Sequence, residues 1–415
     1  MSGSPTAWYH SINSRQWKSL VASQLGWMLD AMDVMLYAFA LGTIQQEFGL
    51  TSAEAGALAS VTLVASAFGG ILFGVLADRI GRAKALMYSI LLYSTFTALT
   101  ATAGSIAELV LWRALVGIGM GGEWSAGSVL VSETWPPEHR GKAIGIMQSG
   151  WAIGYILAAL LAAAILPVFG WRILFVLGIL PALFTLWIRR HVPEPEIWLK
   201  ERAMPGKETA SPLQQIFRFP LLRKTLSAAI LSTCVLFAYW GLFTWMPSFL
   251  SRPLEQGGAG LGIVKSSTWI IPMQLGAFLG YISFGFFADR FGRRPVFLFF
   301  LIAAAVLVPV YGQLARHEVL LLLLGPLIGF FGHGYFSVFG AMLAELFPTH
   351  VRGTAQGLTY NLGRAFSALA PFTIGALADQ HGIGSALALT SAFFLLGAGL
   401  MFLLPETRGT DLAMK

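Results

Sequence analysis

The sequence predicts an all-α membrane protein with twelve transmembrane helices arranged as two six-helix halves. The chain is 56% hydrophobic and only 11% charged, whereas a soluble domain carries roughly 25% charged residues. A membrane-spanning helix needs about 20 predominantly apolar residues, and twelve such runs follow one another along the chain. Two motif-bearing loops of the first half recur in the second at almost the same separation. A soluble helical protein would need polar helix faces that these runs lack.

The apolar runs also divide the chain into domains. The first six predicted helices cover residues 20–46, 54–77, 85–104, 107–131, 141–166 and 171–188. The last six cover residues 224–250, 262–288, 296–313, 318–344, 353–378 and 384–404. The charged, proline-containing stretch between them is typical of a cytoplasmic linker. We therefore expect an N-terminal half over 1–188, a linker over 189–222 and a C-terminal half over 223–415.

The distribution of basic residues predicts the orientation. Most of the 27 lysines and arginines fall in segments on one side of the predicted membrane, and the other side holds only Arg172, Arg252, Lys265 and Arg316. Because cytoplasmic loops carry the positive charge, we expect both termini in the cytoplasm. This bias accounts for the net charge of +7, so no nucleic-acid partner is expected. The first run is too long for a signal peptide and carries aspartates. With a single cysteine, Cys234, we expect no disulfide, metal site or cofactor.

Two loops repeat between the halves. GVLADRIGRAK at residues 74–84 matches GFFADRFGRRP at residues 285–295. ETWPPEHRGKAIG at residues 133–145 matches ELFPTHVRGTAQG at residues 345–357. Parallel repeats of this kind imply a pseudo-twofold axis along the membrane normal, a substrate site near the midplane between the halves, and alternating access.

The Asp-Arg-x-Gly-Arg loops resemble the signature loops of the major facilitator superfamily. A finer resemblance, carried by WYHSINSRQW, LGWMLDAMD and ETWPPEHRGKA, is to the sialate:proton symporters, which include bacterial sialic acid and lactate/pyruvate permeases. The aromatic-acid:proton symporters are a close second, with an acidic pair in the first helix and an arginine in the eleventh. This resemblance implies the major facilitator fold and a bacterial inner membrane location.

The repeated loops are candidates for conformational gating. An aspartate there can accept hydrogen bonds from helix N-termini across the interface, and the arginines can pair across it. Simple positive-inside anchoring is the alternative, but it explains neither the aspartates nor the glycines. The gating candidates are Asp78, Arg79, Gly81, Arg82, Asp289, Arg290, Gly292, Arg293, Glu133, Arg140, Glu345 and Arg352.

Charged residues inside the apolar runs are the candidates for proton coupling. Asp30 and Asp33 lie three residues apart on one face of the first helix, and a carboxylate removed from water binds a proton more readily. In the resembling sugar porters, an aspartate at the place of Asp33 faces an arginine at the place of Arg113. We rank Asp33 first for the proton and Asp30 second. Glu123 is either a further titrating group or a tether between helices, and the aspartates are alternatively a structural pair.

Arg364 in the eleventh predicted helix is the candidate for binding an anionic substrate. Its planar guanidinium matches a carboxylate in a bidentate arrangement. The alternative is a structural pair with an acid of the second half, for which the sequence offers only Glu345. The remaining candidates for the substrate pocket are Asn361, Tyr37, Gln148, Trp151, Tyr155, Tyr239, Gln274 and His333; packing is the alternative role for the aromatic side chains and His333.

The sequence therefore predicts a monomeric, proton-coupled symporter that imports a small organic carboxylate, such as lactate, pyruvate, sialic acid or an aromatic acid. No phosphate-binding loop of an ATPase occurs in the chain, so an ion gradient is the expected energy source. A neutral sugar or drug carrier of the same fold is the nearest alternative. A transporter-like sensor is a third, although the cytoplasmic tail is short. No constellation of residues indicates an enzyme.

Overall fold

The computed structural model describes residues 8–196, 199, 212–347 and 352–407. Every regular element in these ranges is a helix. Backbone N–H and C=O groups in lipid must be satisfied within the structure itself, and a helix does this within a single segment. The prediction of an all-α membrane protein is confirmed.

The helices follow the predicted apolar runs. Those of the first half are η1 (Trp8–Ser11), α1 (Ser14–Phe48), α2 (Ser52–Ile80), α3 (Arg82–Thr100), α4 (Ile106–Thr134), α5 (Pro137–Val176), η2 (Leu177–Ile179) and α6 (Leu180–His191). Those that follow are α8 (Pro212–Ile216), α9 (Leu221–Ser251), η3 (Leu254–Gln256), α10 (Gly262–Phe291), α11 (Arg293–Gln313), α12 (Glu318–Gly334), α13 (Phe336–Leu346), α14 (Arg352–Ser367), α15 (Leu369–His381), α16 (Ile383–Leu387), α17 (Leu389–Leu400) and η5 (Met401–Leu403).

Several of the twelve crossings are joined or interrupted. The fifth and sixth predicted helices run together as α5, whose backbone breaks at Gly170. The tenth, eleventh and twelfth are each divided in two, at Tyr335, Ala368 and Ala388. Among the described residues, eight segments are long and apolar enough to cross a membrane on their own. Breaks at membrane depth are tolerated where the backbone is buried in protein or lines a cavity.

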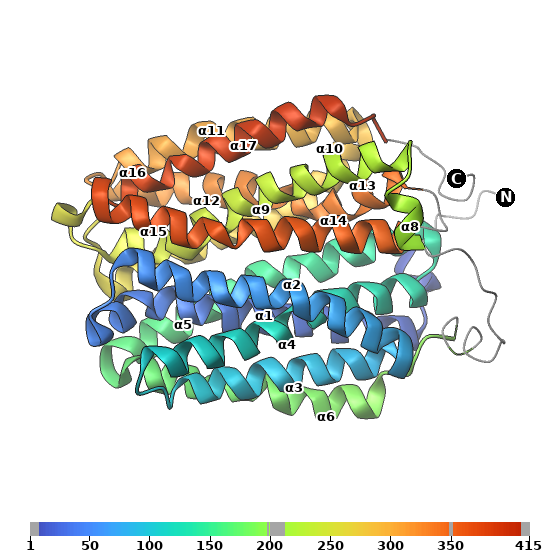
Figure 1. Cartoon of the computed structure of the whole chain (residues 1–415), viewed down its shortest axis with the longest axis horizontal. Helices are drawn as coiled ribbons and strands as arrows, with labels where there is room; N and C mark the ends of the chain where they lie inside the picture. The colour runs from blue at the N-terminus through green and yellow to red at the C-terminus, as the bar shows by residue number, and fades with distance from the viewer. Residues whose placement is uncertain (1–7, 197–198, 200–211, 348–351, 408–415) are drawn as a thin grey trace.

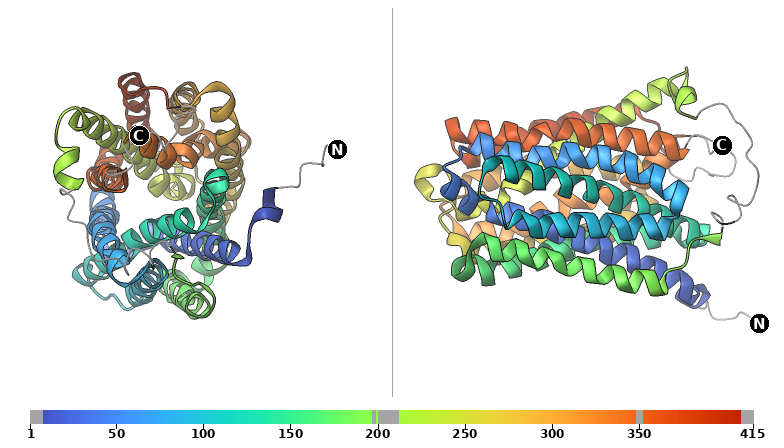
Figure 2. Two further views of the ribbon diagram at one scale, coloured as in Figure 1. Left: turned by 90° about the vertical axis from the view of Figure 1, so that its right-hand side faces the viewer. Right: turned by 60° about the horizontal axis from the view of Figure 1, so that its bottom comes forward.

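The helices form one bundle with two sides. Figure 1 shows α1–α6 packed together and α9–α17 packed against them, and the end-on view in Figure 2 shows the same division. The sides meet where α5 packs on α10 and where α2 packs on α14 and α15. α1 begins and η5 ends at one end of the bundle (Figure 1), which we call the terminal end; we call the opposite end the far end. The domain boundaries at residues 188 and 223 remain a prediction.

The internal repeat has a structural counterpart at the terminal end. The Glu194 carboxylate accepts hydrogen bonds from the backbone N–H groups of Ala83 and Lys84 at the start of α3. The Glu406 carboxylate does the same for the first two residues of α11. An anion at a helix N-terminus interacts favourably with the helix dipole. Each half therefore ends with a glutamate that caps its own third helix.

These caps explain two of the predicted gating glycines. Gly81 and Gly292 precede the capped helices with φ of 113° and 102°, a region that L-residues rarely adopt. A Cβ atom on Gly81 would lie 2.3 Å from a carboxylate oxygen of Glu194. The glycines are needed for the turn and for the approach of the capping carboxylate.

Candidate functional site

Three carboxylates gather inside the first half of the bundle. Asp30 and Asp33 come from α1 and Glu123 from α4, and their exposed fractions are 0%, 1% and 0%. The oxygens of Asp30 and Glu123 accept no hydrogen bond from a described residue, and the hydroxyl group of Thr97 is the neighbour of the Asp33 carboxylate. Glu123 lies against α1, because a Cβ on Gly26 would be 2.5 Å from its Oε1 atom. No group of three acids, histidines or cysteines among the described residues is placed to hold a metal ion.

Asp33 faces the third helix and the start of the sixth crossing. A Cβ on Gly178 of η2 would lie 3.4 Å from Asp33 Oδ1 and 2.2 Å from a methyl group of Thr97. Tyr93, one turn before Thr97 on α3, is fully buried, and its hydroxyl group makes no hydrogen bond with a described residue. Tyr93 lies within electrostatic reach of all three carboxylates. Sequence reasoning missed Tyr93, because a tyrosine in an apolar helix gives no signal until its neighbours are known.

Arg113 of α4 lies on the far-end side of these carboxylates. Its Nε donates to Thr62 Oγ1 of α2 at 3.2 Å, and its guanidinium lies 4.6 Å from the centroid of the Tyr37 ring. Tyr37 in turn donates from its hydroxyl group to the backbone oxygen of Ala55 at 3.0 Å. Arg113 is within electrostatic reach of Asp33, but no ion pair within 4.0 Å joins them among the described contacts.

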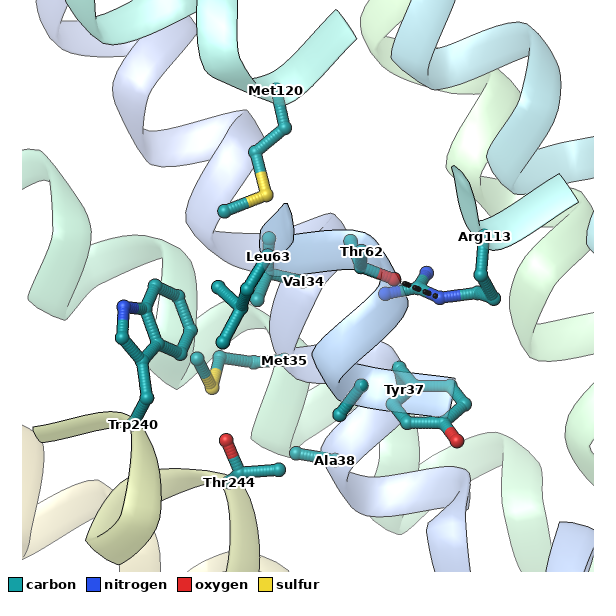
Figure 3. Close-up of a pocket in the computed structure, with 11 residues that line it drawn as sticks. Val34, Met35, Tyr37, Ala38, Thr62, Leu63, Arg113, Met120, Trp240 and Thr244 are labelled. Carbon is teal, nitrogen blue, oxygen red and sulfur yellow. Dashed lines mark hydrogen bonds between the residues drawn. The ribbon is translucent and has the colours of Figure 1, made fainter. Parts of the chain in front are cut away.

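A small cavity lies beside Arg113 between the two halves. Figure 3 shows Arg113, Thr62 and Tyr37 on one side of it, and Trp240 and Thr244 of α9 on the other. Its volume of about 20 Å³ admits about one water molecule. Pockets for organic ligands measure roughly 300–1,000 Å³, so the site is closed around its side chains in this structure.

Arg364 enters the same interior from the second half. It is 2% exposed, and its guanidinium lies over the ring of Tyr360 at 5.2 Å. Asp30 and Glu123 are both within electrostatic reach of Arg364. Its Nε makes no hydrogen bond with a described residue. The sequence suggests an acid of the second half as the alternative partner of Arg364. The structure instead brings Arg364 close to two acids of the first half.

Aromatic stacking fixes the level at which Arg364 meets those acids. Trp124, the residue after Glu123, stacks on Tyr360, with the ring centroids 4.5 Å apart and the planes 17° apart. Trp124 also donates from Nε1 to Gln148 Oε1 at 3.3 Å. Asn361 packs against α2, because a Cβ on Gly70 would lie 2.7 Å from its Oδ1 atom. α14 therefore contacts α2 and α4 on the terminal-end side of Arg364.

A chain of hydrogen bonds crosses between the halves at the centre. Trp151 of α5 donates from Nε1 to the hydroxyl oxygen of Tyr239 on α9. Tyr239 lies 3.4 Å from Nε2 of His333, and His333 Nδ1 lies 3.2 Å from the backbone oxygen of Gly329. A neutral imidazole that donates from Nδ1 and accepts at Nε2 satisfies both contacts. Four of the predicted pocket residues have hydrogen-bond partners within the protein. Trp151, Tyr239 and His333 bond to one another in this series, and Tyr155 donates to the backbone oxygen of Phe243 at 3.0 Å. Their role in binding substrate remains a prediction.

Gln274 of α10 is the remaining predicted pocket residue. It is fully buried, and neither atom of its amide has a hydrogen-bond partner among the described residues. A buried amide without partners is costly, so Gln274 is available for a polar group that enters the interior.

The predicted gating residues lie at the terminal end, and one pair is well defined. Arg82 donates from Nη2 and Nε to the two carboxylate oxygens of Glu133 at 3.0 and 3.1 Å, and from Nη1 to the backbone oxygen of Ala77 at 2.9 Å. This pair joins the start of α3 to the end of α4 within the first half. Of the other candidates, Arg79 and Arg290 are exposed and Arg293 is partly buried. The side chains of Asp78, Asp289, Arg140, Glu345 and Arg352 lie outside those the structure describes.

A second set of contacts between the halves lies at the far end. The Asp379 carboxylate accepts hydrogen bonds of 3.0 Å from the N–H groups of both Ser52 and Ala53 at the start of α2. Arg252 donates to Gln45 Oε1 at 2.7 Å and to Ser52 Oγ at 3.2 Å. Burial lowers the pKa of Arg252, and the nearby Asp379 opposes that change. Sequence reasoning missed this far-end clamp of Gln45, Ser52, Arg252 and Asp379, because its members stand in no repeated motif.

Comparison with known proteins identifies the family of this chain. The model of the Major Facilitator Superfamily matches residues 25–282 and 266–413. The cis,cis-muconate transport protein of Acinetobacter baylyi is 34% identical over 93% of this chain and 94% of its own length. The sialic acid transporter NanX of Escherichia coli is 31% identical over 94% of each chain. The solved structure of a D-xylose-proton symporter superposes with a TM-score of 0.76 at 20% identity, over 96% of this chain and 100% of that one, and shares its fold.

Proposed function

Because the chain belongs to the major facilitator superfamily of membrane transporters, we propose that it is a proton-coupled symporter that imports a small organic carboxylate by alternating access. The protein is an integral membrane protein and not an enzyme. We place it in a bacterial inner membrane, as a monomer with both termini in the cytoplasm.

Arg364 is the observation that carries the carboxylate assignment. It lies buried between the halves, and its Nε has no described hydrogen-bond partner. An arginine in such a setting can bind a carboxylate through two parallel, charge-assisted hydrogen bonds. The relatives named for muconate and for sialic acid both take acids. Both acids carry a carboxylate, which is the group that the guanidinium of Arg364 is suited to bind in this chain.

The three buried carboxylates support proton coupling. Ionisable residues at membrane depth are costly and are typical of ion or proton pathways. Asp30, Asp33 and Glu123 are fully buried within the first half, and a carboxylate removed from water binds a proton more readily. The gating residues at the terminal end and the far-end clamp are suited to open and close the two entrances in turn.

Uptake into proteoliposomes tests the proposal directly. We expect an inward proton gradient to drive accumulation of one or more of four acids, namely benzoate, cis,cis-muconate, lactate and N-acetylneuraminate. The methyl ester of the accepted acid should not be accumulated, because it has no charge for Arg364 to bind. Equal uptake with and without the gradient would exclude proton symport.

A carrier of neutral molecules is the second candidate, and one observation favours it. Asp30 and Glu123 already offset the charge of Arg364, so a neutral cargo would require no rearrangement of charge. In that case the methyl ester or a neutral sugar would bind as tightly as the acid, and Arg364 would be a structural residue.

A further inference from the structure

The buried charges of the described residues do not balance. Six charged side chains are buried among the described residues, and one of them, Arg82, is paired with Glu133. The other five are Asp30, Asp33, Glu123, Arg113 and Arg364. Three carboxylates thus face two guanidinium groups. If all five were ionised, the interior would hold one net negative charge.

No other described group supplies the missing positive charge. The titratable side chains around the carboxylates are Tyr37 on α1, Tyr93 on α3 and Tyr360 on α14, all neutral in their ordinary form. His333 belongs to the hydrogen-bond chain that a neutral imidazole satisfies. A net charge in an apolar interior is strongly unfavourable, so the third carboxylate must hold a proton.

The geometry locates that proton. Arg113 lies 4.6 Å from the ring centroid of Tyr37, one turn beyond Asp33 on α1, and acts electrostatically on Asp33. Glu123 lies against Gly26, one turn before Asp30, and both of these acids act electrostatically with Arg364. The stacked rings of Trp124 and Tyr360 bring α4 next to Glu123 and α14 next to Arg364 into contact. Asp33 is therefore the carboxylate nearest Arg113 in charge, and we assign the surplus acid to the pair Asp30–Glu123.

We propose that the interior stays electrically neutral throughout transport, so that the number of protons carried equals the negative charge of the substrate. This inference rests on the proposed function. The empty carrier holds one proton on the Asp30–Glu123 pair. When a monocarboxylate binds Arg364, one proton from the outer solution joins the remaining ionised carboxylate of the pair. Inside, the anion and that proton leave, and the carrier returns with its retained proton.

The same rule predicts two transported protons for a dicarboxylate. Its second negative charge requires a second transported proton, and Asp33 is the carboxylate left to take it. Transport of either substrate then moves no net charge across the membrane.

Calorimetry on the purified protein at neutral pH tests this count. Binding enthalpy is measured in buffers of different ionisation enthalpy, and the slope gives the protons taken up per ligand bound. The probes are cis,cis-muconate, its monomethyl ester, benzoate and N-acetylneuraminate. We expect a slope of about two for muconate and about one for the three monoanions. Absence of binding by all four acids would overturn the proposed function and this inference with it. A slope that differs from the ligand charge would overturn the inference alone.

Substitutions test whether Asp30 and Glu123 share the proton or whether one of them alone holds it. Asp30→Asn and Glu123→Gln should each keep a slope of about one for a bound monoanion, because one acid of the pair remains. The double variant should lose proton uptake, since no acid is left beside Arg364. Glu255→Gln, in the exposed loop after α9, is the control and should behave as wild type. A slope near zero in either single variant would contradict the shared proton.

A flux measurement requires no variant and covers the case in which the double variant fails to fold. In proteoliposomes without a pH gradient, an imposed potassium diffusion potential should leave uptake of the bound monoanion unchanged. Accumulation driven by the potential would mean that net charge crosses the membrane, and the neutrality rule would be wrong.

Discussion

The two halves of this bundle share a fold but treat buried polar groups in opposite ways. The first half buries three carboxylates. The second half, in its described residues, buries no carboxylate and contributes one buried charge, Arg364. Tyr239 and His333 instead take part in a chain of hydrogen bonds between neutral groups, while the amide of Gln274 has no described partner. Under the proposed function, the first half would handle protons and the second would contribute Arg364 as the link to the substrate.

Replacing Arg364 should have the largest effect, because it removes that link. We expect Arg364→Ala to weaken binding of the accepted acid about 10- to 200-fold, since a charge-assisted hydrogen bond contributes roughly 1.5–3 kcal/mol. Arg364→Lys should restore part of the affinity, because lysine keeps the charge but loses the planar fork. Calorimetry on folded protein measures both.

Arg316→Ala is the control for that experiment, since Arg316 is exposed at the far end. If Arg364→Ala bound the acid with wild-type affinity, Arg364 would not be the anion-binding residue. The division of roles between the two halves would then be wrong.

The close contact between α1 and Glu123 offers a second test. The methyl group of Gly26→Ala would lie 2.5 Å from Glu123 Oε1, so the Glu123 carboxylate must shift from its position against α1. Overpacking of this kind costs about 1–3 kcal/mol, and we expect lower thermal stability together with impaired proton-driven uptake.

Gly42→Ala is a matched control on the same helix. A Cβ at Gly42 meets nothing within 4 Å, and replacing a helical glycine by alanine is favourable by roughly 0.5–1 kcal/mol. If Gly26→Ala transports as well as Gly42→Ala, the position of Glu123 against α1 is not important for coupling.

The local features of this molecule could be predicted from the sequence, and the contacts between helices could not. Apolar run length predicted the helices, and a charge within such a run singled out Asp30, Arg113 and Arg364. Tyr93 and Asp379 were missed because their significance depends on which helices pack together.

The capping glutamates Glu194 and Glu406 could be predicted only in part. Pro-Glu occurs at residues 193–194 and again at 405–406, after the last crossing of each half. A comparison of the halves could therefore have found both caps, but their target, the first backbone N–H groups of the third helix in each half, required the structure.

The far-end clamp predicts a moderate shift between conformations. Asp379→Asn keeps the shape of the side chain but removes the charge that caps α2, and losing a capping interaction costs about 0.5–2 kcal/mol. We expect the far end to open more often. Spin labels at Glu108 and Glu255, which lie at the far end on opposite halves and are exposed, would report this as a larger population of long distances.

Asp379→Glu is the informative companion, because it keeps the charge and displaces it by one methylene group. A distance distribution that is the same in wild type, Asp379→Asn and Asp379→Glu would show that the clamp does not hold the far end closed.

The smallest expected effect concerns the hydrogen-bond chain that joins the halves. Trp151→Phe removes the donor to Tyr239 but keeps an aromatic ring against Trp27, whose centroid lies 4.6 Å from that of Trp151. A single hydrogen bond contributes about 0.5–1.5 kcal/mol, so we expect a modest loss of thermal stability. The number of protons taken up should stay unchanged, because the chain holds no charge. Calorimetry of Trp151→Phe with the accepted acid checks both. A changed proton number would mean that His333 exchanges protons with the carboxylates, and the second half would then take part in proton handling.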